Sequence, residues 1–390
     1  MKILVANIGS TTFKYRLIDS TTGSNLAQGK AERIGVAGSP FPTYEAAIDT
    51  ALSDLVGVDK AVKSLSELNA ISFKTVHGGP CSGARFVDKT VLDAMEEFTF
   101  YAPAHNIPYL AAMRAFATSV PNVPLVAVFE TGFFANLDSA TFTYAVPYEW
   151  QLNYGIRRYG FHGASHRAAS ERVVQLTGDP HVRHISCHLG GSSSLAAIRA
   201  GVAIDTSFGI SPQSGLPQNN RVGDIDVFAI LELMKRLNVT VDEMAGLLST
   251  KSGLAGISGG SGDVRDLLAA AENGDARSKL ALDVYTRSAR NYIAQFYVEL
   301  GGVDVVSFTG GIGENSPELR AEICTGLEVL GVELDSSANQ LVSGEGWIDR
   351  AGSQTRILVM PADEESVVAR ATVELLASKE GAASLAKAEG

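Results

Sequence analysis

The sequence predicts an α/β protein built from two related halves, and three observations lead to this prediction. Strand-like apolar runs alternate with helical patterns along most of the 390 residues. A hairpin rich in Gly, Ser and Thr near the N-terminus returns about half a chain length later. Hydrophobic residues make up 45 % of the chain and charged residues 19 %, so a large core is available and disorder throughout is excluded.

The first predicted element is a buried strand over residues 3–6, which runs into the turn sequence NIGSTT. A second strand over 13–18 completes a hairpin whose tip offers backbone N–H groups and hydroxyls. The pattern returns over 184–198 as HISCHLGGSSSLAAI, with Asn7 aligned on His188 and Thr11-Thr12 aligned on Ser192-Ser193. We interpret the repeat as an internal duplication. Two unrelated hairpins are the alternative.

The remaining elements follow in order from their apolar periodicity. Between the hairpins we predict strands over 70–73 and 124–129 and helices over 90–98 and 108–118. The second half is predicted to hold helices over 226–237, 241–248, 263–272 and 276–300, strands over 304–308 and 356–360, and a last helix after 361–365. The halves are expected to meet near 147–153, and the Ala/Gly/Lys/Glu-rich tail 379–390 is expected to fray.

Charge and cysteine usage exclude several function classes. The formal net charge of −11 disfavours nucleic acid and anionic membrane surfaces as partners, because both require a basic face. The three cysteines are odd in number and far apart, without CxxC or Cys/His zinc spacing, so no disulfide framework or structural metal site is expected. No apolar run approaches the ~18 residues of a membrane span, and the N-terminus does not read as a leader. We therefore expect a cytoplasmic protein.

Glycine-rich turns and histidines indicate the kind of site. Two hairpin tips with Gly and small hydroxyls are typical of a phosphate cradle, in which backbone N–H groups bind the oxygens. The chain lacks GxxxxGK[ST], and GGIGEN (310–315) fits GxGxxG poorly, which argues against P-loop and Rossmann sites. Five of the seven histidines lie in compact segments rich in Gly, Pro or Asn: VHGG, APAHN, GFHGASH with two, and CHLGG. A single such histidine is usually a structural hydrogen bonder, but several together favour a polar cleft.

At this point the sequence resembles a known family, the acetate kinases, which form acyl phosphates and belong to the sugar kinase, Hsp70 and actin superfamily. The resemblance runs from Lys2 to about Leu376. It rests on NIGSTTFK (7–14), HGG (77–79), APAHN (102–106), VFETGF (128–133), YGIRRYGFHGASH (154–166), CHLGGSSS (187–194), DTSFGISP (205–212), NRVGDID (220–226), KSGLAGISG (251–259), FTGGIGENSPE (308–318) and PADEE (361–365).

The resemblance implies a fold of duplicated ribonuclease H-like domains, of the actin and Hsp70 ATPase type, flanking an active-site cleft. The first domain would comprise residues 1–149 plus about 370–390, and the second, with the adenosine pocket, residues 150–369. The implied reaction is reversible in-line transfer of the ATP γ-phosphoryl group to a short carboxylate, giving an acyl phosphate and ADP. Mg²⁺ is the implied ion, with Mn²⁺ as a substitute, and a homodimer is the implied assembly. A carboxylate is already ionised near neutral pH and needs no general base.

Site residues carry over from the family by motif. Arg221 matches the arginine that holds the carboxylate and the transferring phosphoryl group, and His162 matches the histidine on the transition-state oxygens. Asn7 and Glu364 match the residues that organise Mg²⁺. The resemblance implies three further catalytic positions, Lys74, His105 and Glu130. The residues implied to bind the nucleotide, besides Asn7, are Ser10, Thr12, Lys14, His188, Gly190, Gly191, Ser192, Asp263, Val264, Arg265, Gly310, Gly311, Ile312, Gly313 and Asn315. The residues implied to line the acyl pocket are Val76, Ala104, Phe161 and Pro212.

The departures from the family pattern concentrate in the acyl and phosphoryl half of this set. Lys74 stands where the family has Arg, Glu130 where it has Asp, Ala104 where it has Leu, and Gly191 where it has Asn. Lys keeps the charge of Arg but loses its planar fork, and Glu130 is one methylene longer than Asp, so the two changes are expected to compensate. The pattern indicates retained ATP chemistry with an altered acyl acceptor or rate. Neutral drift is the alternative.

Three functions remain open from the sequence. The first is a short-chain carboxylate kinase, with acetate favoured and a larger acid such as propionate or butyrate as a variant. The second keeps the fold but uses another phosphoryl donor such as pyrophosphate, which the intact GGIGEN and DVRD segments disfavour. The third is a nucleotide-binding protein without turnover. A sugar kinase is less favoured, because no base for a hydroxyl acceptor stands out.

Overall fold

The computed structural model describes residues 1–9 and 11–378, which form two compact units. Unit 1 comprises Met1–Ala135 and the segment from Asp363 onward, and unit 2 comprises Asn136–Ala362. The boundaries expected from the resemblance, 149/150 and about 370, lie C-terminal to the two boundaries of these units, which follow Ala135 and Ala362. The expected fraying of 379–390 falls outside the described residues.

Unit 1 is built on a six-stranded sheet with the strand order β3-β2-β1-β4-β6-β5. Its strands are β1 (Lys2–Ile8), β2 (Thr12–Asp19), β3 (Ser24–Glu32), β4 (Ala70–Thr75), β5 (Ala84–Phe86) and β6 (Leu125–Phe129). The first three are antiparallel neighbours, β4 and β6 run parallel to β1, and β5 closes the edge antiparallel to β6.

Unit 2 repeats this topology strand for strand, which confirms the predicted duplicated α/β fold. Its sheet order is β11-β12-β10-β7-β8-β9. The strands are β7 (Arg183–Leu189), β8 (Ser193–Arg199), β9 (Val202–Thr206), β10 (Val305–Thr309), β11 (Gly346–Trp347) and β12 (Arg356–Val359). Strand directions match those of unit 1, and even the register shift recurs, after Leu17 in β2 and after Ala197 in β8.

The strand register corrects one detail of the predicted repeat. Ile8 pairs with Phe13 in the first hairpin, whereas Leu189 pairs with Ser193 in the second. Thr12 therefore corresponds to Ser192, and the first turn is one residue longer than the second. The predicted alignment of Thr11-Thr12 on Ser192-Ser193 had no gap, so it shifts the second strand of one hairpin by one residue relative to the other.

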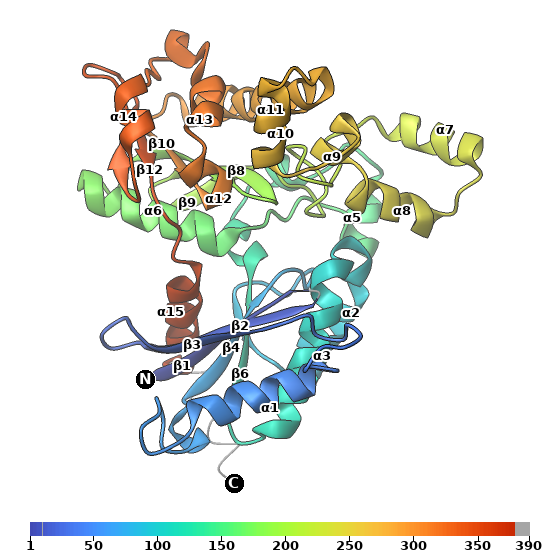
Figure 1. Cartoon of the computed structure of the whole chain (residues 1–390), viewed down its shortest axis with the longest axis vertical. Helices are drawn as coiled ribbons and strands as arrows, with labels where there is room; N and C mark the ends of the chain where they lie inside the picture. The colour runs from blue at the N-terminus through green and yellow to red at the C-terminus, as the bar shows by residue number, and fades with distance from the viewer. Residues whose placement is uncertain (10, 379–390) are drawn as a thin grey trace. The chain divides into compact units, whose positions relative to one another are not determined.

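Helices cover both faces of the first sheet. They are α1 (Tyr44–Leu55), α2 (Lys89–Glu97), α3 (Pro103–Ser119) and α15 (Glu364–Leu376). Because strand side chains alternate, Ile71 and Phe73 join the core beneath α1 and α3, while Ser72 faces α15 and bonds Thr372 at 2.6 Å. Figure 1 shows α15 and α1 on opposite sides of this sheet.

The second sheet also has helices on both faces, and unit 2 carries further helices beyond them. Its helices are α4 (Ser139–Phe142), α5 (Tyr148–Tyr154), α6 (Gly163–Thr177), α7 (Val227–Leu237), α8 (Val241–Thr250), α9 (Gly253–Ser258), α10 (Val264–Glu272), α11 (Ala276–Leu300), α12 (Gly310–Asn315), α13 (Pro317–Cys324) and α14 (Ser336–Leu341). Ile185, Cys187 and Leu189 join the core with α11, while α6 packs on the other face of β7 (Figure 1). Within residues 1–9 and 11–378, no helix is both long and apolar enough to cross a membrane.

Candidate active site

In each unit several of the predicted site residues lie where the parallel strands end. Asn7 lies near the end of β1, Lys74 near the end of β4, and Glu130 directly after β6. The register places Ala6 beside Phe73 and Lys74 beside Val128, so the three side chains occupy neighbouring strand ends. The carboxyl edge of a parallel sheet is where ligands bind in open α/β folds.

Lys74 joins two carboxylates in unit 1. Its ammonium forms an ion pair with Glu364 and a second pair with Glu130 at 3.7 Å. All three side chains are largely buried, with 17 % of Lys74, 15 % of Glu364 and 3 % of Glu130 exposed. Burial alone would lower the pKa of Lys74, but the two carboxylates outweigh it and raise the pKa above its usual value. The two substituted positions, Lys74 and Glu130, thus face each other directly.

Tyr109 lies near this charged group, and sequence reasoning missed it. The residue lies on α3, four positions after His105, and its buried hydroxyl accepts a hydrogen bond from the Ile8 backbone at 3.1 Å. Burial raises the pKa of Tyr109, with the charges of Lys74, Glu130 and Glu364 close by. The i,i+4 spacing from a site histidine was the signal that could have found it.

The donors assigned to a metal are hard oxygen ligands. Asn7 offers an amide oxygen and Glu364 a carboxylate, from β1 and from α15, which packs on that strand. No group of three or more His, Cys, Asp or Glu side chains in the described residues could hold a metal ion. Two oxygen donors, Asn7 and Glu364, fit Mg²⁺, because this ion keeps most of its water ligands when it binds to a protein. Lys74 neutralises part of the Glu364 charge.

The other predicted residues of unit 1 surround these strand ends. Lys14 is exposed and pairs with Asn7 across β1 and β2. Thr12 opens β2, and its carbonyl accepts from the Gly9 backbone at 2.8 Å. The remaining members are half-buried or exposed: Val76 after β4, and Ala104 and His105 in the first turn of α3. Ser10 lies outside the described residues.

Two glycine turns meet in unit 2. Thr309 at the end of β10 pairs with His188 near the end of β7. A Cβ on Gly190 would lie 3.9 Å from the Gly311 backbone nitrogen, so the turn after β7 and the start of α12 are adjacent. Gly310 has φ of +80°, and a Cβ there would lie 2.7 Å from the Leu189 carbonyl oxygen. Only glycine fits this approach, which brings Gly190, Gly191 and Ser192 beside the predicted purine pocket, Gly310–Asn315.

Arg221 lies against the first of these turns. Its Nη1 donates to Ser192 Oγ at 3.1 Å and to Gln218 Oε1 at 3.3 Å. Ser192 also donates to Gln218 Oε1 at 2.7 Å, and the Gln218 amide donates to the carbonyl of Pro212 at 2.8 Å. Burial lowers the pKa of Arg221 from its usual value. The cluster therefore joins Arg221, the phosphate turn and the loop that holds Pro212.

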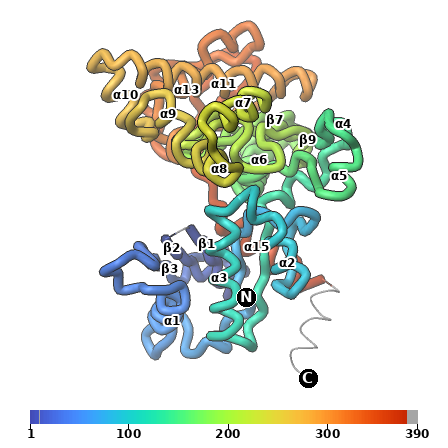
Figure 2. Tube along the Cα trace, turned by 90° about the vertical axis from the view of Figure 1, so that its right-hand side faces the viewer, coloured from blue at the N-terminus to red at the C-terminus, as the bar shows by residue number. Residues whose placement is uncertain are grey.

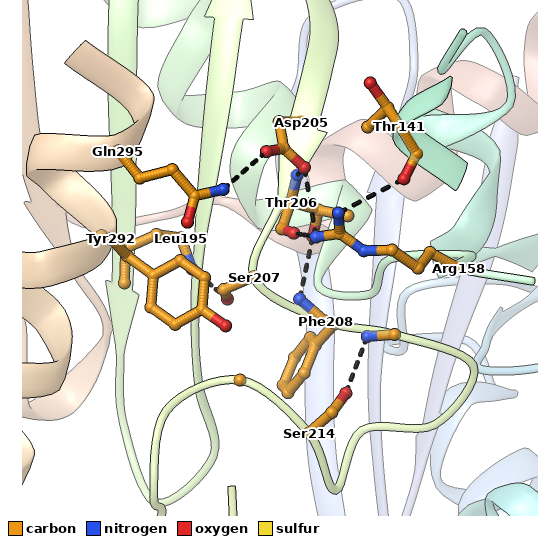
Figure 3. A network of polar contacts seen from close by, with 12 residues as sticks. Thr141, Arg158, Leu195, Asp205, Thr206, Ser207, Phe208, Ser214, Tyr292 and Gln295 are labelled. Carbon is orange, nitrogen blue, oxygen red and sulfur yellow. Dashed lines mark hydrogen bonds and ion pairs between the residues drawn. The ribbon is translucent and has the colours of Figure 1, made fainter. Parts of the chain in front are cut away.

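The ion pair between Arg158 and Asp205, drawn in Figure 3, anchors the chain a few residues before His162. Arg158 pairs with Asp205 at 3.1 Å and donates to the carbonyls of Thr141 and Thr206. Asp205 also accepts from Gln295 at 3.1 Å, and burial raises its pKa while Arg158 opposes the rise. Since Arg158 and His162 are four residues apart, this network fixes the segment between them.

Phe161 and His162 follow from that anchor. The Phe161 ring is 2 % exposed and packs edge-on against Phe208, with 5.7 Å between ring centroids. His162 precedes α6 with φ of +57°, a left-handed conformation that is uncommon for a residue with a Cβ. Its ring lies 4.2 Å from that of His188, so two predicted histidines are brought together.

The predicted adenosine contacts lie at the start of α10. Asp263 caps that helix by accepting from the Arg265 backbone at 2.9 Å, and their side chains form an ion pair at 2.6 Å. The hydrogen bonds from Arg265 lower the pKa of Asp263 to about 2. Val264 is buried, whereas Arg265 is 88 % exposed. Within the described residues, no hydrogen bond or ion pair joins this pair to α12.

Comparisons with known proteins give consistent results. Residues 2–370 match the model of the Acetokinase family. An acetate kinase of Bacteroides thetaiotaomicron is 40 % identical over 397 residues, which cover 96 % of this chain and 100 % of the relative. The crystal structure of Porphyromonas gingivalis acetate kinase has a TM-score of 0.87 at 35 % identity, covering 96 % of this chain and 99 % of that one. A propionate kinase structure from Francisella tularensis has a TM-score of 0.88 at 30 % identity, covering 95 % and 98 %.

Proposed function

The chain belongs to the acetokinase family, and on that premise we propose that it transfers the γ-phosphoryl group of ATP to acetate, reversibly, giving acetyl phosphate and ADP. The observation that best supports this reaction is the placement of Arg221 on the Ser192 turn. Phosphoryl transfer requires alignment and neutralisation of the equatorial oxygens more than covalent help. The glycine turn would align the phosphoryl group, and the Arg221 guanidinium beside it would neutralise the charge on the oxygens.

The nucleotide would bind to unit 2. The turn at Gly190–Ser192 would hold phosphate oxygens through backbone N–H groups and the Ser192 hydroxyl. The adjacent Gly310–Asn315 segment would hold the purine, and Asp263, Val264 and Arg265 would contact the adenosine. The close approach that requires glycine at 310 supports this assignment, because a side chain there would fill the turn.

Asn7 and Glu364 would hold Mg²⁺, largely through water, with Mn²⁺ as a substitute. When bound, the ion would shield charge on the phosphate oxygens. Lys74 would add a fixed positive charge beside the same carboxylate. Lys74 and Glu130 would position the acid, and Val76, Ala104, Phe161 and Pro212 would line its alkyl group.

Position 104 gives the first expected result. Ala104→Leu restores the bulk usual in the family and leaves less room for the extra methylene of propionate. We therefore expect kcat/KM for propionate to fall about tenfold relative to acetate. Steady-state rates with acetate, propionate and butyrate measure this ratio. Ala104→Ser is the control, since it adds little volume. An unchanged ratio in Ala104→Leu would place the alkyl group elsewhere.

The proposed reaction is tested with the whole chain, Mg²⁺, ATP and a panel of C2–C5 carboxylates, with the acyl phosphate trapped as hydroxamate. The reverse assay supplies acetyl phosphate and ADP and measures ATP. No product in either direction contradicts the proposal. Pyrophosphate replacing ATP as donor would favour the second function, and ATP binding by calorimetry without transfer would favour the third.

We further propose a homodimer through α7. This helix has no buried residue, and Val227, Phe228 and Leu231 are 61 %, 75 % and 49 % exposed. Figure 1 shows α7 and α8 projecting from the second sheet, and Figure 2 shows them on the near side of unit 2. A second copy would bury this apolar face.

The dimer has its own expected result. Phe228→Glu should convert the dimer to a monomer in sedimentation velocity, because the carboxylate would be desolvated at the interface. Phe100→Glu is the matched control, since Phe100 is also exposed, at 58 %, but belongs to unit 1. A wild-type chain that sediments as a monomer contradicts the proposal.

We also propose that the enzyme works in the cytoplasm. Its proposed substrates, ATP and a short carboxylate, are cytoplasmic metabolites. Cys81, Cys187 and Cys324 are all free thiols in the structure, which suits a reducing compartment.

A further inference from the structure

A layer of polar side chains separates α6 from β7 and β8. Strand alternation turns Ser186 and His188 toward α6, and the register places Ser194 of β8 opposite His188. The helix and its N-cap supply the other members. This polar layer consists of His162, Ser165, His166, Ser186, His188 and Ser194. Helix–sheet interfaces are normally apolar, so a polar one has to satisfy each buried group with hydrogen bonds.

Four of these side chains form an unbroken row. His162 Nδ1 lies 2.9 Å from Ser194 Oγ, and Ser194 Oγ lies 2.8 Å from His166 Nε2. His166 Nδ1 then lies 2.8 Å from Ser186 Oγ. Ser194, His166 and Ser186 are each 0 % exposed. His188 is held separately, through Nδ1, by Ser165 at 2.7 Å.

The protons in this row cannot be arranged freely. The Ser194 hydroxyl has one proton and two imidazole neighbours, so it donates to one and accepts from the other. Burial, together with the neighbouring His188 and His184, lowers the pKa of His166 well below its usual value. His166 is therefore neutral and carries one N–H. Two arrangements satisfy the row. If His166 donates from Nε2 to Ser194, then Ser194 donates to His162 Nδ1 and Ser186 donates to His166 Nδ1. If His166 donates from Nδ1 to Ser186, then Ser194 donates to His166 Nε2 and accepts from His162 Nδ1, which leaves His162 Nε2 without a proton.

We propose that Ser194 and His166 are positioning residues that keep neutral His162 in its Nε2–H tautomer. This inference rests on the proposed function, in which His162 contacts the transferring phosphoryl group. Phosphoryl oxygens only accept hydrogen bonds, so His162 has to present an N–H to them and not a lone pair. A donor on Nδ1 enforces that state, because a nitrogen that accepts a hydrogen bond carries no proton.

The row also fixes the direction of the His162 ring. Its backbone is left-handed and is held on one side by the Arg158 network of Figure 3. His188 of β7 and His166 of α6 face the ring at centroid distances of 4.2 and 6.5 Å, and Phe208 faces it at 5.3 Å. Ser194 adds a directional hydrogen bond, which ring packing alone does not provide.

Position 166 offers a matched pair of variants. The amide of Gln places a donor near the position of Nε2 in histidine, whereas the shorter Asn reaches only the position of Nδ1. His166→Gln therefore keeps a donor to Ser194, and His166→Asn keeps only the contact with Ser186. We expect kcat to stay within about threefold in His166→Gln and to fall about ten- to a hundredfold in His166→Asn and Ser194→Ala. The KM for ATP should be unchanged in all three.

Nitrogen-15 NMR of histidine-labelled protein gives a readout that does not depend on turnover. Wild-type and His166→Gln spectra above pH 7.5 should show His162 protonated at Nε2, and Ser194→Ala should show a mixture of tautomers. A wild-type His162 protonated at Nδ1 would overturn the proposal, even if every variant failed to fold. Equal kcat losses in the two position-166 variants would assign His166 a packing role only. A chain without kinase activity would overturn the proposed function but leave the tautomer result standing.

Discussion

Arg221→Ala is expected to lower kcat for acyl phosphate formation by about 10³-fold or more, in both directions. The guanidinium is held by Ser192 and Gln218 beside the glycine turn, so its charge is already in place when the phosphoryl group transfers. Its loss removes an interaction made mainly in the transition state, so the KM for ATP should change little. Steady-state kinetics and calorimetric ATP binding measure the two effects.

Arg221→Lys is the informative control. Lysine keeps the charge but loses the planar fork, so its kcat should lie between those of the wild type and the alanine variant. Ser192→Ala removes one neighbour of the arginine and should cost much less. If Arg221→Ala retained more than a tenth of the wild-type kcat, the phosphoryl group would have to be neutralised by other residues.

Lys74→Ala is expected to destabilise unit 1 by about 3–5 kcal/mol at pH 7, because it leaves two buried carboxylates without their cation. Glu130 and Glu364 would then repel each other, and the pKa of one of them would rise. The variant gains a proton in the folded state as the pH falls, so its deficit should shrink between pH 7 and pH 5. Hydrogen exchange of peptides from β4 and α15 reports this local stability.

A charge-neutral control separates this effect from loss of volume. Lys74→Met keeps most of the side-chain volume and should be nearly as destabilised at pH 7. Lys89→Ala removes a surface lysine of the same unit, which is 87 % exposed, and should have no effect. A deficit in Lys74→Ala that does not change with pH would contradict the electrostatic explanation.

Lys74 and Glu130 also test whether two departures from the family pattern compensate for each other. Lys74→Arg and Glu130→Asp each restore one family residue, and the structure places the two side chains 3.7 Å apart. If the substitutions compensate, the double variant should have a higher kcat/KM than either single variant, with a coupling of about 0.5–3 kcal/mol. Additive effects would show that the two positions changed independently.

Local pattern predicted the fold where periodicity was strong. The helix predicted over 276–300 matches α11, which repeats a buried residue about every turn. Helix α6 was not predicted, because the face it turns to the sheet carries Ser165 and His166 among its apolar residues. Strand β3 was missed as well, since Ala31 is its only buried residue and the inward positions Ala27, Gly29 and Ala31 are small, so the sequence shows little hydrophobic alternation.

The sequence predicted which residues belong to the site, but not which of them contact each other. Motifs gave Lys74 and Glu130 as departures, yet the pairing of Lys74 with Glu364 joins positions 290 residues apart. Ser194 lay inside a quoted motif without an assigned role, because its importance comes from the two rings that the fold brings to its hydroxyl. Tertiary hydrogen bonds of this kind leave no spacing rule in one sequence.

Helix α15 belongs to unit 1 although the ribosome makes it after all of unit 2. During synthesis β1, β4 and β6 therefore emerge without the helix that covers Ser72 and Lys74, whereas every strand of unit 2 is complete by Ala362. Because unit 1 needs a helix made last, we expect unit 2 to be completed first, against the usual order in which the N-terminal part folds first. Until α15 is made, Lys74 lacks its partner Glu364, so we expect unit 1 to reach its final structure only after translation of the last helix.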